Sequence, residues 1–156
     1  RARHPPARSA ARPAGLDSAC RTGRLSGGQA KGRAMTSLTL VGIRLAEPGT
    51  EFVYRGEAEP CEGCPYREQC LTLTEGRRYR VASVRENANT LECGVHEGGV
   101  RAVEVEPAAV RANVARSTAY AGSKASLEGP CPHTGCPSHE LCEPAGAEMG
   151  EEYRIA

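Results

Sequence analysis

Two cysteine-rich segments of similar sequence constrain the fold of this chain more than any other feature. The first, CEGCPYREQC, covers residues 61–70, and the second, CPHTGCPSHELC, covers residues 131–142. Each contains a Cys-Pro step and a glutamate two residues before its last cysteine. Each is followed a few residues later by a glycine and then by Tyr-Arg-Val or Tyr-Arg-Ile. Such self-similarity predicts an internal duplication with two similar units.

The density of thiols in these segments predicts metal binding. The cysteines are Cys61, Cys64 and Cys70 in the first segment, and Cys131, Cys136 and Cys142 in the second. A disulfide framework is typical of exported proteins, and no export signal is visible. Thiolates two residues apart can share one ion or cluster, and the proline after Cys64 and Cys136 favours an extended cysteine. We therefore predict that a metal centre clips each unit.

A tetrahedral site needs a fourth ligand in each unit. For the first unit we predict Cys93, which follows the strand expected after Gly76 and can fold back across a hairpin. The same distance after Gly150 lies beyond the last residue, so the second unit is expected to be truncated or to be completed by a histidine. The candidate extra ligands are His133 and His96, with His139 as a further candidate.

The first 34 residues differ in composition from the rest of the chain. Residues 1–34 hold eight Arg or Lys and one acidic residue, whereas residues 35–156 hold 12 basic and 18 acidic residues. A basic, proline-broken segment buries too little apolar surface to offset its ordering entropy. We therefore predict a disordered leader that is not native, and we set Cys20 aside with it. The sequence contains no apolar run of membrane-spanning length, which excludes a transmembrane helix.

The remaining 122 residues predict a mainly β fold, with a small α+β fold as the alternative. Apolar and polar residues alternate, as in half-buried strands, within residues 38–45, 52–54, 79–81 and 103–105. The chain has one Phe and no Trp, so metal centres are expected to supply part of its stability. The predicted organisation is a first β and cysteine unit at 35–107, an extended linker at 108–130, and a second, incomplete unit at 131–156.

A family resemblance covers residues 35–156. The segments MTSLTLVGIRLAEPGTEFVYRG, EGRRYRV and HEGGVRAVEVEP, together with both cysteine segments, closely resemble an uncharacterised family of cysteine-rich archaeal proteins, number 0179 of the UPF series. The resemblance implies an archaeal source and a cytoplasmic location. It also implies that family members continue with a further strand and cysteine. It brings no known activity.

The spacing of the cysteines bears on the identity of the metal. Structural zinc sites usually pair two short C-x2-C knuckles, whereas this chain has C-x2-C-x5-C and a distant fourth cysteine. The segment CEGCPYREQC is similar to cluster-binding loops in auxiliary domains of radical enzymes and in certain nuclease domains that hold a four-iron cluster. An all-cysteine shell suits either metal. We predict an iron-sulfur cluster of the [4Fe-4S] type, with zinc as the alternative.

Two functional hypotheses follow from this pattern. The first is a small cytosolic metalloprotein that acts with a protein partner as a redox carrier, sensor or accessory subunit. The alternative is a zinc-stabilised adaptor for RNA or a translation complex, using the exposed arginines Arg77, Arg78 and Arg80. The sequence shows no phosphate loop, nucleophile elbow or zinc-protease helix, so an enzyme is not favoured and no catalytic residue is predicted.

Overall fold

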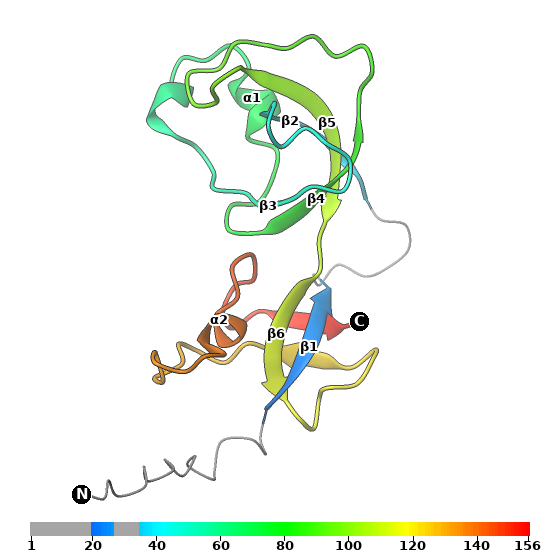
Figure 1. The fold of residues 1–156 in the computed structure, drawn as a ribbon, viewed down its shortest axis with the longest axis vertical. Coiled ribbons are helices and arrows are strands. Elements are labelled where there is room, and N and C mark those ends of the chain that lie inside the picture. The colour runs from blue at the N-terminus through cyan, green and yellow to red at the C-terminus, as the bar shows by residue number, and fades with distance from the viewer. Residues whose placement is uncertain (1–19, 27–34) are drawn as a thin grey trace, which may run out of the picture.

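The computed structural model describes residues 20–26 and 35–156, which fold into two four-stranded antiparallel sheets (Figure 1). The strand order is β2-β5-β4-β3 in the first sheet and β6-β1-β8-β7 in the second. The helices in the described residues are single turns, and within this part of the chain none is long and apolar enough to cross a membrane. The prediction of a mainly β fold is confirmed.

The first sheet is built around strand β5. Its strands are β2 (Ser37–Gly42), β3 (Glu51–Val53), β4 (Arg78–Val84) and β5 (Val100–Pro107). Along β5, buried Val103 and Val105 alternate with glutamates that lie nearer to solvent. β-Branched side chains pack well on a pleated surface, so this alternation gives one apolar face. That face packs with Tyr79, Val81 and Val41 in the core of the first unit.

The second sheet includes residues that were expected to be a linker. Its strands are β6 (Val110–Ala115), β1 (Cys20–Ser26), β8 (Glu152–Ile155) and β7 (Lys124–Ser126). The linker prediction for 108–130 was wrong, because this segment supplies both β6 and β7. Val110, Ala112 and Val114 share one buried face of β6. The period is that of a strand, and the small Ala112 completes the apolar alternation.

The prediction of a disordered leader was wrong for residues 20–26, which form strand β1. This strand pairs with β6 along its length and with β8 at its end. Leu25 is 1% exposed and belongs to the core of the second sheet. Composition averaged over the leader missed this short strand, because its order comes from hydrogen bonds to strands distant in the sequence. Residues 1–19 and 27–34 lie outside the described part of the chain.

The middle of β1 offers room for a larger residue at Gly23. A Cβ atom built there would lie 3.4 Å from Val114 Cγ2 and 3.5 Å from Ile155 Cδ1, which is ordinary van der Waals contact. Glycine in a strand costs about 0.5–1 kcal/mol relative to alanine. We expect Gly23→Ala to raise the free energy of unfolding by about this amount, measured by urea denaturation. Unchanged or lower stability would show that β1 does not hold this position in solution.

The two sheets repeat the same backbone contacts at corresponding strands. The amide of Gly49 donates to Val81 O at 2.8 Å in the first sheet, and the amide of Gly122 donates to Ile155 O at 2.8 Å in the second. Both glycines have positive φ, 89° and 84°, a conformation that glycine adopts without strain. This match equates Val81 with Ile155 and β4 with β8. It supports the duplication that the sequence repeat predicts.

Salt bridges at corresponding positions carry opposite charges in the two sheets. Glu51 on β3 pairs with Arg78 on β4 at 3.5 Å, whereas Lys124 on β7 pairs with Glu152 on β8 at 2.6 Å. In each sheet, therefore, the first residue of the short edge strand forms an ion pair with the adjacent strand, and the charges of the two pairs are reversed between the sheets. The edge pairing is retained although the side chains have been exchanged.

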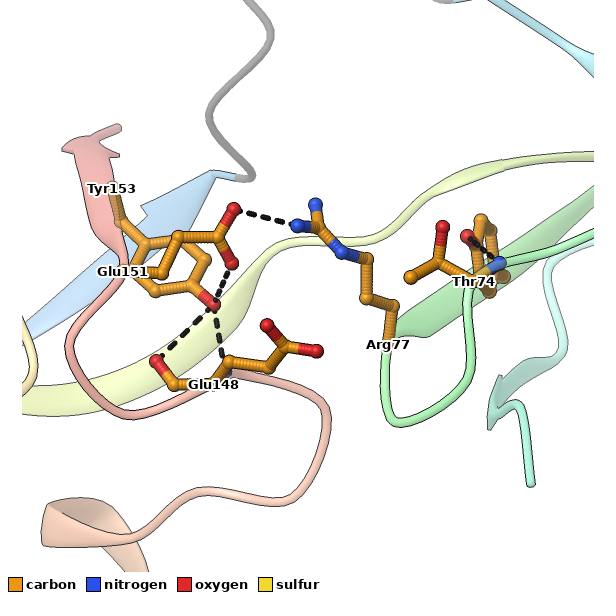
Figure 2. Close-up of polar contacts among 6 residues, drawn as sticks. Thr74, Arg77, Glu148, Glu151 and Tyr153 are labelled. Carbon is orange, nitrogen blue, oxygen red and sulfur yellow. Dashed lines mark hydrogen bonds and ion pairs between the residues drawn. The ribbon is translucent and has the colours of Figure 1, made fainter. Parts of the chain in front are cut away.

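A polar cluster joins the two units (Figure 2). The guanidinium of Arg77, which precedes β4, donates to Glu151 Oε1 at 2.6 Å, and the hydroxyl of Tyr153 donates to Glu151 Oε2 at 2.8 Å. The same hydroxyl accepts a hydrogen bond from the amide of Glu148 at 2.7 Å.

The first unit contains a matching tyrosine contact: the hydroxyl of Tyr79 accepts a hydrogen bond from the amide of Thr74, five residues earlier, at 3.0 Å. The units thus share a tyrosine contact and meet through a partly buried ion pair.

This ion pair predicts a pH-dependent stability. The pKa of the Glu151 carboxyl is lowered, first by the hydrogen bond from Tyr153 and, against the effect of burial, by Arg77. A lowered pKa stabilises the fold above the pKa of the unfolded carboxyl, about 4.3, and this stabilisation is lost as the pH falls through the folded value. We expect Glu151→Gln to lower the free energy of unfolding by about 1 kcal/mol at pH 7, and by progressively less as the pH falls below about 4.

The control for this experiment is Glu97→Gln. Arg44 and Glu97 pair at 2.7 Å, but their side chains are 78% and 85% exposed, against 29% and 28% for Arg77 and Glu151. Exposed pairs contribute little, so the control should lose less than about 0.5 kcal/mol at any pH. Urea denaturation between pH 3 and 8 measures both variants. Equal losses of stability in the two variants would show that the ion pair between Arg77 and Glu151 has no special role.

Candidate metal centre

The first cysteine segment is a series of tight turns between two short helices. Helix η1 (Glu59–Cys61) ends at Cys61, and helix α1 (Arg67–Cys70) ends at Cys70. Between them the amide of Cys64 donates to Cys61 O at 3.2 Å, and the amide of Arg67 donates to Cys64 O at 3.2 Å. Gly63 allows the turn with a φ of 76°. These turns keep the three cysteines within one compact loop.

Helix α1 is fixed against the first sheet at its carboxyl end. It contacts β2. The hydroxyl of Thr39 donates to Gln69 O at 3.3 Å, and the hydroxyl of Tyr54 donates to Cys70 O at 3.1 Å. Thr39 is buried, so its hydroxyl has to find an acceptor within the protein. These bonds position Cys70 relative to the rigid part of the fold.

The loop that carries Cys93 lies beside the first cysteine segment. Leu91 and Val100 exchange backbone hydrogen bonds of 2.9 and 2.8 Å, which close the base of this loop. A Cβ atom built on Gly94 would lie only 3.0 Å from Pro60 Cβ. Gly94 follows Cys93 and Pro60 precedes Cys61, so this close approach brings the predicted fourth ligand next to the segment that holds the other three.

The electrostatics of Cys70 also reflect the approach of the Cys93 loop to the first segment. Burial raises the pKa of the Cys70 thiol to about 11, and the nearby thiols of Cys64, Cys93 and Cys61 contribute in the same direction. All four cysteines are free and partly buried. Without a cation the Cys70 thiol is therefore neutral at pH 7. A bound cation would favour the thiolate, which is the form that binds metals.

Hydrogen bonds to sulfur occur in both cysteine-rich regions. The amide of Val95 donates to Cys93 Sγ at 3.4 Å, and the amide of Ser138 donates to Cys136 Sγ at 3.4 Å. In both cases the donor lies two residues after the cysteine. Such bonds stabilise negative charge on sulfur and tune the potential of sulfur-bound clusters.

The second cysteine segment is organised around helix α2 (His139–Cys142), which contacts β6. The side-chain amide of Asn113 on β6 donates to Cys142 Sγ at 3.5 Å. The amide of Cys131 donates to Glu143 Oε1 at 2.7 Å, which ties the start of the segment to the end of the helix. Sequence reasoning missed Glu143, whose only signal was its position directly after the last cysteine.

The three histidines considered as extra ligands lie in different surroundings. His133 is exposed, and the exposed His96 has its ring against Gly42, where an added Cβ would lie 2.7 Å from Nδ1. His139 is less exposed. Its Nε2 atom is buried, makes no hydrogen bond within the described residues, and lies 3.7 Å from Glu143 Oε1. Within the described residues, none of the three histidines belongs to a group of three or more side chains that could hold a metal ion.

The thiols do not yet form a coordination shell. Over residues 20–26 and 35–156, no group of three or more Cys, His, Asp or Glu side chains is arranged so that it could hold a metal ion. The backbone brings Cys93 beside the first segment and Cys131 beside the end of α2, but the side chains do not converge on common points. As a donor set the first four thiols suit zinc or an iron-sulfur cluster.

The arginines considered for nucleic-acid binding are engaged with carboxylates. Arg77 pairs with Glu151, Arg78 with Glu51, and Arg80 with Glu106. The pKa of Arg80 is raised, chiefly by its hydrogen bond to Glu106. A phosphate group would have to compete with these carboxylates for each guanidinium.

The fold and the site define a small, mainly β protein with two cysteine-rich loops set against its sheets. Comparison with known proteins places the chain in a family: it belongs to the uncharacterised protein family UPF0179, whose model matches residues 37–156. The resemblance inferred from the sequence motifs is thereby confirmed.

Relatives in archaea are similar over most of the chain. The chain is 71% identical over 122 residues to a UPF0179 protein of Haloarcula marismortui, covering 78% of this chain and 82% of the relative. It is 70% identical over 121 residues to one of Natronomonas pharaonis, with the same coverage. It is 44% identical over 121 residues to one of Methanoregula boonei, covering 78% of this chain and 80% of the relative. No solved structure matches the chain.

Proposed function

We propose that this protein is a small metalloprotein that binds an iron-sulfur cluster through Cys61, Cys64, Cys70 and Cys93. The observation that carries the proposal is the approach of Gly94 to Pro60, 3.0 Å from a Cβ built on the glycine to Pro60 Cβ. This approach joins a fourth cysteine to a loop that already holds three. Four partly buried free thiols in one region, in a chain with so small an apolar core, are typical of a protein that a metal helps to stabilise.

The chemistry of the donors favours a cluster or zinc over other metals. Thiolates are soft ligands, and a set of four suits zinc and iron-sulfur clusters, whereas calcium and magnesium require oxygen. The C-x2-C-x5-C spacing departs from the paired knuckles of structural zinc sites, so iron-sulfur is preferred and zinc is kept as the alternative. When bound, a cluster would supply one-electron transfer or a structural clamp on the first unit.

A second centre is proposed on Cys131, Cys136 and Cys142. The hydrogen bonds that link Cys131 to Glu143 and Asn113 to Cys142 hold two of these cysteines at opposite ends of one segment. With three thiols the segment needs one further ligand. His139 has a buried Nε2 without a hydrogen-bond partner in the described residues, and it is the histidine within the segment best shielded from water.

The proposed role is that of a redox carrier, sensor or accessory subunit in the cytoplasm. All seven cysteines with described side chains are free thiols, which suits a reducing compartment. The RNA-adaptor alternative gains no support from the arginines, because Arg77, Arg78 and Arg80 each face a carboxylate.

Anaerobic purification with metal and sulfide analysis tests the proposal. We expect a brown protein that contains iron and acid-labile sulfide in equal amounts, with an absorption band that is lost on reduction by dithionite. A colourless protein that contains zinc alone would exclude the cluster and retain the metal centre. A protein free of both metals after expression with iron and zinc supplied would exclude the metalloprotein altogether.

A further inference from the structure

The second sheet contains two cross-strand pairs of like charge. Arg24 on β1 lies directly opposite Arg111 on β6, and Lys124 on β7 lies directly opposite Arg154 on β8. All four side chains are exposed. Like charges that face each other directly on neighbouring strands destabilise a sheet. A sheet that keeps two such pairs departs from local consistency, and such departures are typical of functional surfaces.

All four basic residues lie on the same face of the sheet. Leu25 of β1 and Ile155 of β8 are opposite each other in the core. Successive side chains of a strand point to opposite faces, so Arg24 and Arg154, which directly precede these two residues, share the outward face. β1 and β6 lie side by side in the lower half of Figure 1. The basic residues therefore form a stepped row across all four strands.

The row has little acidic compensation within the part of the chain that the structure describes. The one acidic residue of these four strands is Glu152, which pairs with Lys124 at 2.6 Å. Arg24 and Arg111 form no ion pair or side-chain hydrogen bond with any described residue. Each guanidinium carries five N–H donors, so the pair offers these donors to a ligand from solution.

The first sheet provides an internal comparison, because its strands repeat those of the second. Since β4 is equivalent to β8, Glu104 of β5 corresponds to Arg24, and Leu38 of β2 corresponds to Arg111. The arginines of β4 are neutralised by carboxylates, in the pairs Arg78–Glu51 and Arg80–Glu106. The basic row is therefore a property of the second sheet and not of the repeated fold.

The length and chemistry of the row favour duplex DNA as its ligand. Neighbouring strands are about 4.8 Å apart, so the row spans about 14 Å across four strands. This length is comparable with the width of the DNA major groove, about 12 Å, and lets the row contact phosphates on both sides of the groove. The major groove of duplex RNA is narrower. The outward face of these four strands carries no aromatic side chain on which unpaired bases could stack.

We propose that the outward face of the second sheet binds the phosphate backbone of duplex DNA, with Arg24 and Arg111 at the centre of the contact. Guanidinium groups bind phosphate oxygens in bidentate geometry. Contacts to phosphate carry no sequence information, so the binding is independent of sequence. This function goes beyond the proposed metal centres and does not depend on them.

The test measures fluorescence anisotropy of a labelled DNA duplex of two helical turns with the full chain as purified. We expect the affinity to fall about tenfold or more between about 50 and 200 mM salt, because each neutralised phosphate releases counterions. Arg111→Glu should weaken binding about tenfold or more at the lower salt concentration. The new glutamate faces Arg24 and forms a cross-strand ion pair, so this variant should unfold at a higher urea concentration than the unaltered chain. Weaker binding together with higher stability separates loss of the site from loss of the fold.

The control variant is Arg44→Glu, which makes the same change in net charge on the first unit. Arg44 is 78% exposed, and its substitution should change the affinity by less than about twofold. The proposal is overturned if the unaltered chain shows no salt-dependent binding, or if Arg44→Glu weakens binding as much as Arg111→Glu does. Tighter binding of duplex RNA of the same sequence, or of polyglutamate, would also overturn it, because the ligand would then be RNA or an acidic peptide.

Discussion

Cys70→Ser should abolish metal binding at the first centre and destabilise the first unit more than any other single change to a cysteine. Cys70 is the thiol whose surroundings include Cys64, Cys93 and Cys61, and its helix is tied to the sheet through Tyr54. A thiolate-bound metal can contribute on the order of 10 kcal/mol to folding, comparable with the net stability of a whole domain. Metal analysis per chain and thermal unfolding of the anaerobic protein measure the two effects.

Two other cysteine variants serve as controls for this prediction. Cys20→Ser changes a cysteine outside both segments and should leave the metal content unchanged. Cys136→Ser should remove metal from the second segment alone. The metal lost in this variant and the metal lost in Cys70→Ser should then add up to the metal content of the unaltered chain. If Cys70→Ser retains the full metal content, Cys70 is not a ligand and the four-thiol centre is wrong.

The cysteine pattern made the site partly predictable, but not its assembly. Spacing within one segment is local, so the compact loop from Cys61 to Cys70 could be expected from the sequence. The approach of Gly94 to Pro60 depends on how the loop after β4 folds back, and no local pattern encodes it. The contact between Glu143 and the amide of Cys131 is equally non-local. Sequence alone could nominate ligands but could not show which loops meet.

The strands were predictable where apolar residues alternate clearly and were missed where they do not. Val103 and Val105 alternate with glutamates, which leaves only a strand as the interpretation. In β6, Val110 and Val114 are four residues apart, which suits a helix as well as a strand, and the small Ala112 between them gives a weak signal. Pairing with β1, a contact between segments distant in the sequence, favours the strand over the helix here.

The match between the sheets suggests why so small an apolar core is sufficient. The two cores contain only six and seven buried residues, but in each unit an ion pair also fixes the edge strand and a tyrosine hydroxyl anchors the neighbouring strand, β4 or β8. The pair between Arg77 and Glu151 then joins the units. Polar contacts at repeated positions thus hold the strands in register and leave the cysteine loops on the periphery, where a metal could clamp them.

Leu25→Ala should destabilise the second sheet by about 3 kcal/mol, because it removes a side chain that is 1% exposed in a core of seven buried residues. The matched control is Leu38→Ala on β2. Leu38 is 49% exposed, and its truncation should cost less than about 0.5 kcal/mol. Amide exchange resolves the effect by sheet, and faster exchange should be confined to β1, β6 and β8. Equal, small losses in both variants would mean that β1 is not part of the folded protein in solution.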